Sequence, residues 1–315
     1  MSDTDVITRS PAWHARRAQH IGGSEVAALF DVQPDYALSR YALWHVKAGL
    51  VAPPEVDGER IRWGLRLEPF IAEGAAEQEG WTIHKGGYVS DPVTPGMGCT
   101  LDYVIEAPCE NDEGCEGPGA LELKNADWLV HKRAWTNDEP PSHVLLQHQH
   151  QLGCTGYAWG AVACLVGGNE LRIYRYAARP NLIAEIRRRV ADFWASIAEG
   201  RAPAVDGSDG ASAVLAALYP ELADDAIDMS DNNEWAEAAD EMYAAAAARK
   251  MANDRYDEAK NRIAAILGPH RRGFGNGWAV NVAVTPANPG REPKPGELIG
   301  KRAEVRRFTV KETTA

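Results

Sequence analysis

The stretch CTLDYVIEAPCENDEGCEGPGALELKNAD, residues 99–127, predicts two strands on either side of an acidic, glycine-rich loop. Asp102 lies in the first strand, and Glu122-Leu123-Lys124 lies in the second. Because residues i and i+2 of a strand face the same way, Glu122 and Lys124 should project together, with Leu123 on the opposite face. If the two strands pair, Asp102 comes beside Glu122, and two carboxylates and a cation meet at one point.

Such a cluster suits the hydrolysis of a phosphodiester bond. Mg²⁺ prefers carboxylate oxygens at about 2.0–2.1 Å and keeps several waters. A bound metal lowers the pKa of a water ligand and neutralises developing charge, and an adjacent lysine can orient or deprotonate the attacking water. The alternative interpretation is structural: Asp102 ends a strand, and Glu122 and Lys124 form a solvated pair.

The sequence before this stretch predicts helices. Apolar residues recur every three or four positions in 24–32 and 39–50, which predicts two short helices after a Gly-Gly-Ser turn. A third helical pattern lies between residues 60 and 80. Either that helix begins near Leu67 with Pro69 in its first turn, or Pro69 kinks it. The apolar side of this helix consists of Leu67, Phe70, Ile71 and Ala75.

Strands and helices then alternate in a way that predicts a mixed α/β fold. Strand-like residues separated by glycine and proline turns occupy 81–90, 97–106 and 119–127. The elements that follow are a helix at about 141–157, a strand–turn–strand at 159–177 and an amphipathic helix at 180–200 with the apolar stripe Ile183, Ile186, Val190, Phe193 and Ile197. The order predicts a central mixed β-sheet flanked by helices.

The remaining sequence predicts an extension with no recognisable chemistry. Residues 201–212 are rich in Pro, Gly, Ser and Asp and read as a linker, so we divide the chain into domains at 1–205 and 206–315. A long helix from about Asn232 to Leu267 and a small β hairpin with a long Pro/Gly loop in the tail should serve docking or oligomerisation. The helix carries one stripe at coiled-coil spacing, formed by Ala238, Met242, Ala245, Ala252, Tyr256, Ala259, Ile263 and Ile266.

The overall composition is that of a globular protein, with 45% hydrophobic and 25% charged residues. The formal net charge of −12 does not decide for or against a nucleic-acid partner, because acids gather in segments that look peripheral and the opening segment is locally basic. There is no run of eighteen apolar residues and no signal-peptide core, so we expect a cytoplasmic protein without membrane spans.

Other metal and cofactor sites are poorly supported by the sequence. The five cysteines are scattered and form no CxxC pair, so we expect reduced thiols, and Cys109 with Cys115 falls short of a four-ligand site. His143, His148 and His150 lack the spacing of a zinc motif and are expected to be polar helix residues or DNA-facing donors. No GxxxxGK[ST] loop is present, so the chain has no ATP motor of its own.

The ordered motifs together resemble a known family. IGGSEVAALF at 21–30, WGLRLEP at 63–69, CTLDY at 99–103, LELK at 121–124 and QHQHQLGCTGYAWGAVACLVGGNELRIYR at 147–175 occur in the order and spacing of YqaJ-like viral recombinases. These form the lambda-exonuclease branch of the PD-(D/E)xK nuclease superfamily. The resemblance covers about residues 13–200 and implies a restriction-endonuclease-like core followed by the C-terminal helical and hairpin extension.

The resemblance also assigns residues to roles. Metal ligands would be Glu68, Asp102, Glu122 and the backbone carbonyl of Leu123, while Lys124 matches the catalytic lysine. Gln147 matches a glutamine close to the scissile phosphate. The set expected at the 5′-phosphate of a DNA end is Arg17, Ser24 and Thr100, together with Gln147; an arginine with hydroxyls suits a terminal phosphate dianion. Arg17, Ser24 and Thr100 would otherwise belong to an N-terminal arm with a helix cap at Ser24.

The pattern departs from the family beside the aspartate. Leu101 stands where the family has a proline, and Tyr103 where it has a glycine. Metal ligation needs only the aspartate side chain, so the departure concerns local geometry more than activity.

The activity that the resemblance implies is a Mg²⁺-dependent 5′→3′ exonuclease on linear double-stranded DNA, with two ions and with Mn²⁺ as a substitute. It would leave 3′ overhangs for a single-strand annealing protein, act as a ring-shaped trimer and be encoded by a phage or prophage of a bacterial host. Two alternatives remain: a structure-specific or nicking endonuclease on the same core, and a non-catalytic module that binds DNA ends.

Overall fold

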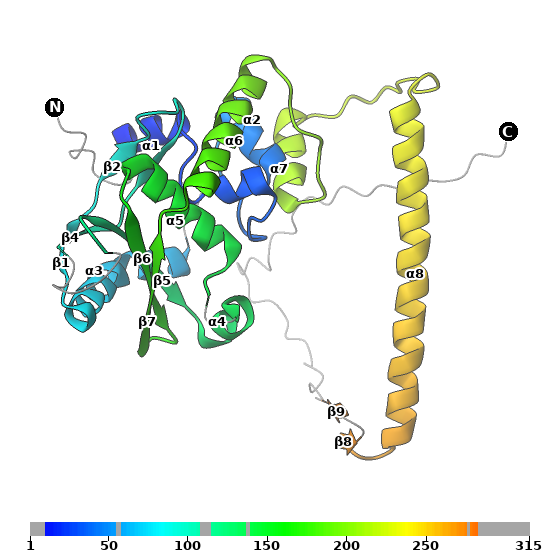
Figure 1. Ribbon diagram of the computed structural model, residues 1–315. Coiled ribbons are helices and arrows are strands. Elements are labelled where there is room, and N and C mark those ends of the chain that lie inside the picture. Colours follow the sequence, from blue (N-terminus) through cyan, green and yellow to red (C-terminus); the bar gives the residue numbers. More distant parts are fainter. Residues whose placement is uncertain (1–9, 55–57, 108–114, 137–138, 276–277, 283–315) are drawn as a thin grey trace, which may run out of the picture. The chain divides into compact units, whose positions relative to one another are not determined.

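The strands on either side of the acidic loop belong to one sheet. The computed structural model describes residues 10–54, 58–107, 115–136, 139–275 and 278–282. By its internal contacts the chain divides into two units, Met1–Leu222 and Ala223–Ala315. The first unit carries the sheet in the order β1-β4-β5-β6-β7 (Figure 1), made of β1 (Thr82–Lys85), β4 (Tyr103–Ala107), β5 (Gly119–Ala126), β6 (Trp159–Val166) and β7 (Glu170–Ala177).

The sheet is mixed, as the element order predicts. β5 and β6 are parallel, and the other three neighbouring pairs are antiparallel. The chain passes from β5 to β6 through α4 (Trp128–Ala134) and α5 (Ser142–Thr155), because parallel strands need a long crossover. Nearly every residue of β6 is buried, as expected for a central strand covered on both faces.

Helices cover both faces of the sheet. On one face, α3 (Glu59–Glu79) packs Ile71 and Ala75 against Leu121 and Leu123 of β5. On the other face lies α5, with α6 (Pro180–Ala198) packed against it. Leu121 and Leu123 thus face α3 while Glu122 faces α5, which is the alternation predicted from the strand period.

The first helices lie on the α5–α6 side of the unit. They are α1 (Pro11–Ala18), the 3₁₀ helix η2 (Val26–Phe30) and α2 (Arg40–Lys47), with a small two-stranded sheet of β2 (Tyr88–Ser90) and β3 (Gly98–Thr100) nearby. Ile21 and Met97 join in an isolated parallel bridge. The predicted stretches 81–90 and 97–106 therefore each break into two strands that belong to different sheets.

Two details of α3 differ from the sequence prediction. Pro69 lies inside a continuous helix that begins at Glu59, so a start near Leu67 is wrong. Phe70 is 69% exposed and does not share the core stripe; Ala72 occupies the buried position instead, beside Ile71. The packing of this stripe on β5 holds the helix together through the proline, which would be costly in isolation.

The predicted linker at 201–212 is helical at its end. α7 spans Asp209–Leu218, and the Ser208 hydroxyl caps it by accepting a hydrogen bond from the amide of Ala211 at 3.0 Å. Ala211 and Val214 are buried against α2. Part of a segment whose composition is typical of a linker therefore forms a helix that is capped and packed against α2.

The second unit contains α8 (Asn233–Leu267) followed by β8 (Arg272–Gly275) and β9 (Trp278–Asn281). The long helix is confirmed, and Asn232 caps it through the amide of Trp235. No residue of α8 is buried, so its predicted apolar stripe is exposed. β9 pairs with the preceding β8 in an antiparallel hairpin; the predicted Pro/Gly loop and the rest of the tail, 283–315, lie outside the described residues.

Candidate active site

Asp102 lies in the turn between β3 and β4, at the edge of β5. The pairing of β4 with β5 sets Tyr103 opposite Leu121, so Asp102 comes beside Glu122. One Asp102 carboxylate oxygen, Oδ2, accepts a hydrogen bond from the backbone N–H of Leu123 at 2.9 Å. The two strands therefore pair in the way that brings the two carboxylates together.

Glu122 is the centre of a polar network under α5. Its carboxylate is 2% exposed. Oε1 accepts hydrogen bonds from Lys124 Nζ at 2.5 Å and from Gln147 Nε2 at 2.7 Å, and Oε2 accepts one from Gln151 Nε2 at 2.5 Å. Glu122 and Lys124 are thus not a solvated surface pair, because the carboxylate is buried and has several donors.

Lys124 is held from two sides. Besides Glu122, it donates a hydrogen bond to Gln147 Oε1 at 3.0 Å. Burial alone would lower the pKa of the Lys124 ammonium, but the Glu122 and Asp102 carboxylates outweigh burial and raise that pKa. The side chain therefore carries a positive charge at neutral pH and can stabilise negative charge.

For Asp102, a raised pKa favours the neutral carboxyl group, not the charged form. Burial, and then repulsion by Glu122, raise the pKa of the Asp102 carboxyl well above its usual range; Lys124 and the Leu123 N–H only partly counter this. Two buried carboxylates that repel each other are stabilised by a cation between them. The pair thus fits a hard divalent ion such as Mg²⁺ by its charge and by its oxygen donors.

Glu68 lies on α3, close enough to Asp102 to raise its pKa further. Its Oε2 accepts a hydrogen bond from Lys85 Nζ at 3.2 Å. Within the described ranges, three or more His, Cys, Asp or Glu side chains nowhere form a preformed metal cluster. Mg²⁺ is usually held by one or two carboxylates, with waters and substrate phosphates as its other ligands. A site with Asp102 and Glu122 as carboxylate ligands is therefore typical of Mg²⁺.

A pocket of about 150 Å³ joins this network to the N-terminal segment. Its lining includes Asp102 and Gln147 from the carboxylate side and Arg17, Ser24 and Thr100 from the predicted phosphate set. The predicted site residues from α1, the Gly-Gly-Ser turn, β3 and α5 thus surround one space.

The phosphate set is ordered by its neighbours. Arg17 donates to the Ser24 hydroxyl at 3.0 Å, and its guanidinium lies over the ring of Trp13 at 5.0 Å. The indole N–H of Trp13 donates to the Thr100 hydroxyl at 2.9 Å. A guanidinium, two hydroxyls and an indole are donors that suit an anion in the pocket.

A largely buried ion pair between Lys47 and Glu25 holds the N-terminal segment that carries Arg17 and Ser24. Lys47 Nζ lies 2.9 Å from Glu25 Oε2 and donates to the backbone carbonyls of Arg17 and His20 at 2.8 and 2.7 Å. Glu25 Oε2 also accepts the backbone N–H of Gly22 at 2.8 Å. The pair therefore fixes the chain on both sides of the turn that holds Ser24.

The Gly-Gly turn allows this chain to approach α5. A Cβ on Gly23 would lie 3.2 Å from Cγ of Gln147 and 3.8 Å from Cγ of Gln151. The absent side chain lets the turn pack directly on the stems of both glutamines. The N-terminal segment thus contacts, through Gly23, the two glutamines that donate hydrogen bonds to Glu122.

Two of the three histidines of α5, His148 and His150, lie inside the fold. His148 and His150 are both 0% exposed, and His150 Nε2 lies 3.0 Å from the carbonyl of Gly98. Of the two expected alternatives, polar helix residues or DNA-facing donors, the first holds for these two, which are polar helix residues inside the fold. Gln151 was missed by sequence reasoning, although its spacing of four residues from Gln147 places both on one helix face.

The cysteines supply no second metal site in the described part of the chain. Cys99, Cys154 and Cys164 are buried thiols without a disulfide, as predicted. Cys115 is buried and receives a contact from Arg175. Its suggested partner Cys109 lies outside the described residues.

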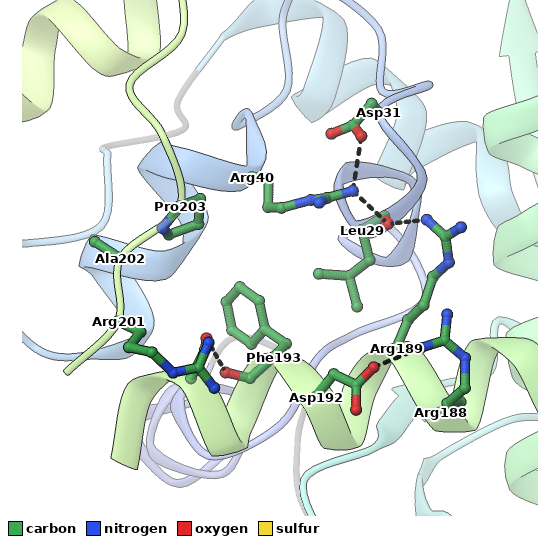
Figure 2. A pocket seen from close by; sticks show the side chains of 11 residues that line it. Leu29, Asp31, Arg40, Arg188, Arg189, Asp192, Phe193, Arg201, Ala202 and Pro203 are labelled. Atoms are coloured by element: carbon green, nitrogen blue, oxygen red, sulfur yellow. Dashed lines mark hydrogen bonds and ion pairs between the residues drawn. The ribbon is translucent and has the colours of Figure 1, made fainter. Parts of the chain in front are cut away.

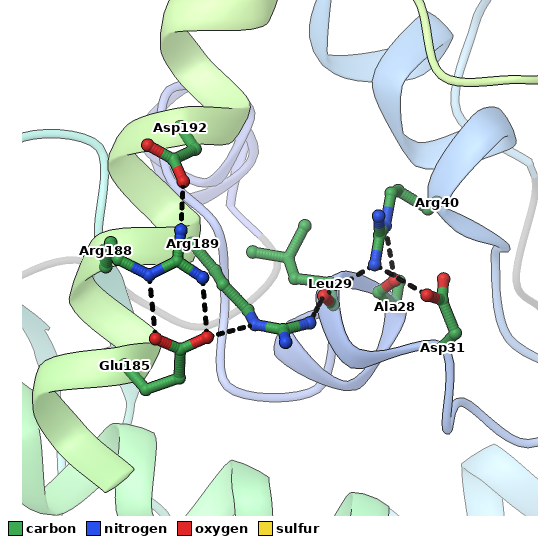
Figure 3. Close-up of polar contacts among 8 residues, drawn as sticks. All are labelled: Ala28, Leu29, Asp31, Arg40, Glu185, Arg188, Arg189 and Asp192. Carbon is green, nitrogen blue, oxygen red and sulfur yellow. Dashed lines mark hydrogen bonds and ion pairs between the residues drawn. The ribbon is translucent and has the colours of Figure 1, made fainter. Parts of the chain in front are cut away.

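A larger pocket, of about 830 Å³, shares no lining residue with the site (Figure 2). Leu29 and Phe193 contribute apolar surface to it, and four arginines surround them. Each of these arginines pairs with a carboxylate. Figure 3 shows Arg40–Asp31, Arg188–Glu185, Arg188–Asp192 and Arg189–Glu185, and Arg201 pairs with Glu199. Since each of these arginines already has a carboxylate partner and no predicted site residue lines this pocket, it does not offer the chemistry of the smaller one.

The fold is that of lambda-exonuclease-like nucleases, with paired carboxylates where β4 and β5 meet. It is similar to the crystal structure of the alkaline exonuclease LHK-Exo from Laribacter hongkongensis, with a TM-score of 0.50 and 21% identity over 61% of this chain and 94% of that chain. A structure of LHK-Exo in complex with dAMP matches with the same TM-score of 0.50 and 22% identity, over 61% of this chain and 94% of that one.

Residues 12–158 match the YqaJ-like viral recombinase domain. The uncharacterized protein YqaJ of Bacillus subtilis (strain 168) is 27% identical over 226 residues, which are 70% of this chain and 67% of that protein. The α/β fold and the family expected from the motifs are confirmed. Among the described residues, no helix is both long and apolar enough to cross a membrane.

Proposed function

We propose that this protein is a metal-dependent deoxyribonuclease that digests linear double-stranded DNA from its 5′ ends by hydrolysing phosphodiester bonds. The observation that carries the proposal is the pocket in which Asp102 and Gln147 meet Arg17, Ser24 and Thr100. The pocket is thus bordered by a carboxylate that can bind a cation and by hydrogen-bond donors that can bind a terminal phosphate dianion. The naming of its structural neighbour LHK-Exo as an alkaline exonuclease supports the same class of activity.

Mg²⁺ is the proposed cofactor, as two ions, with Mn²⁺ as a substitute. Asp102 and Glu122 would hold it, assisted by Glu68 and by the backbone carbonyl of Leu123. When bound, the metal supplies an activated water and neutralises charge on the phosphate. The raised pKa of Asp102 supports this assignment, because it reflects burial of the carboxyl and then repulsion by Glu122, both of which a bound cation would offset.

The remaining residues have roles that follow from their contacts. Lys124 is positively charged and hydrogen-bonded to both Glu122 and Gln147, which suits orientation of the attacking water and stabilisation of developing charge. Gln147 would place the scissile phosphate next to this lysine. Arg17 and Ser24 would bind the 5′-phosphate of the DNA end.

The proposed product is duplex DNA with 3′ single-stranded overhangs, the substrate of a single-strand annealing protein in phage-type recombination. The proposed setting is the cytoplasm of a bacterial host, with a phage or prophage as the source of the gene. We propose a homotrimer, for which the exposed apolar stripe of α8 offers contact surface; sedimentation equilibrium tests it directly.

The experiment uses linear duplex DNA with a 5′-phosphate and a label at the 3′ end of one strand, incubated with Mg²⁺. Wild-type protein and the Lys124→Ala variant are compared, with closed circular plasmid in parallel. Progressive loss of the 5′-ended strand by the wild type alone, with intact plasmid, supports the proposal. Plasmid cleavage would instead favour an endonuclease. DNA binding with no cleavage under any metal would favour an end-binding module.

A further inference from the structure

A buried polar layer lies behind Glu122, between β5 and α5. Gln151 is 1% exposed, and its Nε2 donates to Glu122 Oε2 at 2.5 Å. His148, one turn earlier on the same helix and 0% exposed, interacts with the Gln151 side chain. Among the described residues, Gln151 Oε1 and the two ring nitrogens of His148 have no hydrogen-bond partner, so the bond to Glu122 is the one that orients the Gln151 side chain.

The two oxygens of Glu122 are divided between different donors. Oε1 accepts hydrogen bonds from Lys124 and Gln147, while Oε2 accepts one from Gln151, a buried residue that lines the pocket together with Gln147. The last torsion of a glutamate side chain has no sharp preference of its own. The rotation of this carboxylate is therefore determined by its hydrogen-bond donors, and Gln151 is the donor that fixes Oε2.

The chemistry of an amide matters at this position. A lysine or arginine at residue 151 would neutralise the carboxylate and repel a cation, whereas a glutamine amide orients Glu122 and leaves its charge available. Groups that hydrogen-bond to metal ligands from behind commonly set ligand orientation and basicity. His148 also adds no charge, because burial lowers its pKa to about 4.

The buried polar layer requires a glycine in the neighbouring strand β6. A Cβ on Gly160 of β6 would lie 2.6 Å from Cε1 of His148 and 2.4 Å from the carbonyl oxygen of Ala120. Only glycine lets the β6 backbone pass this close. The strand is thus shaped around His148, which in turn lies against Gln151.

We propose that Gln151 is a positioning residue for Glu122: its amide fixes the carboxylate in the orientation that binds the divalent cation. The inference rests on the proposed metal-dependent function and adds a residue to that site. Because the Gln151 amide donates its hydrogen bond to Glu122, its effect should appear in metal affinity before it appears in DNA binding.

The test compares Gln151→Met with Gln149→Met in the full-length protein. Gln149 is a matched control on the same helix: it is 2% exposed and its side chain bonds to the carbonyl of Ala177 at 3.0 Å and the amide of Arg179 at 2.7 Å, away from Glu122. Mn²⁺ binding without DNA is measured by electron paramagnetic resonance, together with the Tm and the Mg²⁺ dependence of DNA digestion.

We expect Gln151→Met to weaken Mn²⁺ binding by about 10-fold or more, as second-layer substitutions do, and to raise the Mg²⁺ concentration for half-maximal digestion in parallel. Gln149→Met should lower the Tm by a similar amount with Mn²⁺ binding unchanged. Equal Mn²⁺ binding in wild type and Gln151→Met, or equal losses in both variants, would overturn the inference alone. A wild type that neither binds Mn²⁺ nor digests DNA would overturn the proposed function together with it.

Discussion

The amide of Gln147 and the ammonium of Lys124 are joined by a hydrogen bond of 3.0 Å, and both also contact Oε1 of Glu122. The three groups come from β5 and from α5, a helix of the crossover that leads from β5 to β6. Their closed arrangement leaves the lysine positively charged and fixed in position.

Replacing Lys124 by Met should lower the rate of DNA digestion by about 10²–10³-fold, because a preorganised charge that stabilises the transition state is lost. Glu122 keeps its hydrogen bonds from Gln147 and Gln151, so the fold should persist. Single-turnover digestion gives the rate, and circular dichroism provides the folding control. Retention of more than a third of the wild-type rate would contradict the proposed role.

Replacing Arg17 by Ala should change the preference among DNA ends. Hydrogen bonds to a charged group contribute about 1.5–3 kcal/mol, so the advantage of a 5′-phosphate over a 5′-hydroxyl end should fall by about 10-fold or more. Parallel digestion of the two substrates measures this ratio. If both substrates slow equally, Arg17 serves the fold and not the DNA end.

Replacing Lys47 by Met should destabilise the protein by about 3 kcal/mol, because among the described residues Glu25 would keep only Arg17, at 3.4 Å, as a charged partner. The side chain of Lys47 is 3% exposed and that of Glu25 is 15% exposed. Urea unfolding measures the loss. The double variant Lys47→Met with Glu25→Gln should recover part of the stability, and failure to do so would show that the carbonyl contacts of Lys47 matter more than its charge.

The stability of the protein should fall as the pH drops from about 6.5 towards about 4, in part through His148. Burial lowers the folded-state pKa of His148 to about 4, whereas the unfolded state has about 6.5. Between these values the unfolded chain binds more protons, so this contribution is complete above pH 6.5 and is lost as the pH falls, by about 3 kcal/mol in total. Urea unfolding of wild type and His148→Gln across this range should give a smaller pH slope for the variant; equal slopes would refute the assignment.

Replacing Gly160 by Ala should cost about 1–3 kcal/mol or more, since the new methyl group would clash with the Ala120 carbonyl and with His148. Gly64 is a matched control, because a Cβ there meets nothing within 4 Å and the residue lies inside α3. Gly64→Ala should stabilise the protein by about 0.5–1 kcal/mol through helix propensity. Thermal unfolding of both variants shows whether the two effects have opposite signs.

The sheet, α5 and α6 could be predicted because their apolar residues recur with clear periods. The interior position of Pro69 could not, since it depends on how Ile71 and Ala75 pack against a strand distant in sequence. α7 was hidden in the same way: its composition is typical of a linker, and only contact with α2 stabilises it as a helix.

For the candidate site, the motif order identified the residues that surround the pocket, but not how they bond. Gln151 illustrates the limit. Its spacing from Gln147 indicates a shared helix face, yet its partner is defined by the pairing of β4, β5 and β6, which no local pattern encodes. The burial of His148 and His150 depends likewise on strands that surround α5.

The contact of Gly23 with the stems of Gln147 and Gln151 makes two properties of the molecule inseparable. Any side chain placed on that glycine would push on the helix turn that orients Glu122. Variants selected in the Gly-Gly-Ser turn to alter which DNA ends are accepted should therefore also alter turnover, and their effects should not add to those of substitutions in α5. End preference and speed would have to be engineered as one trait.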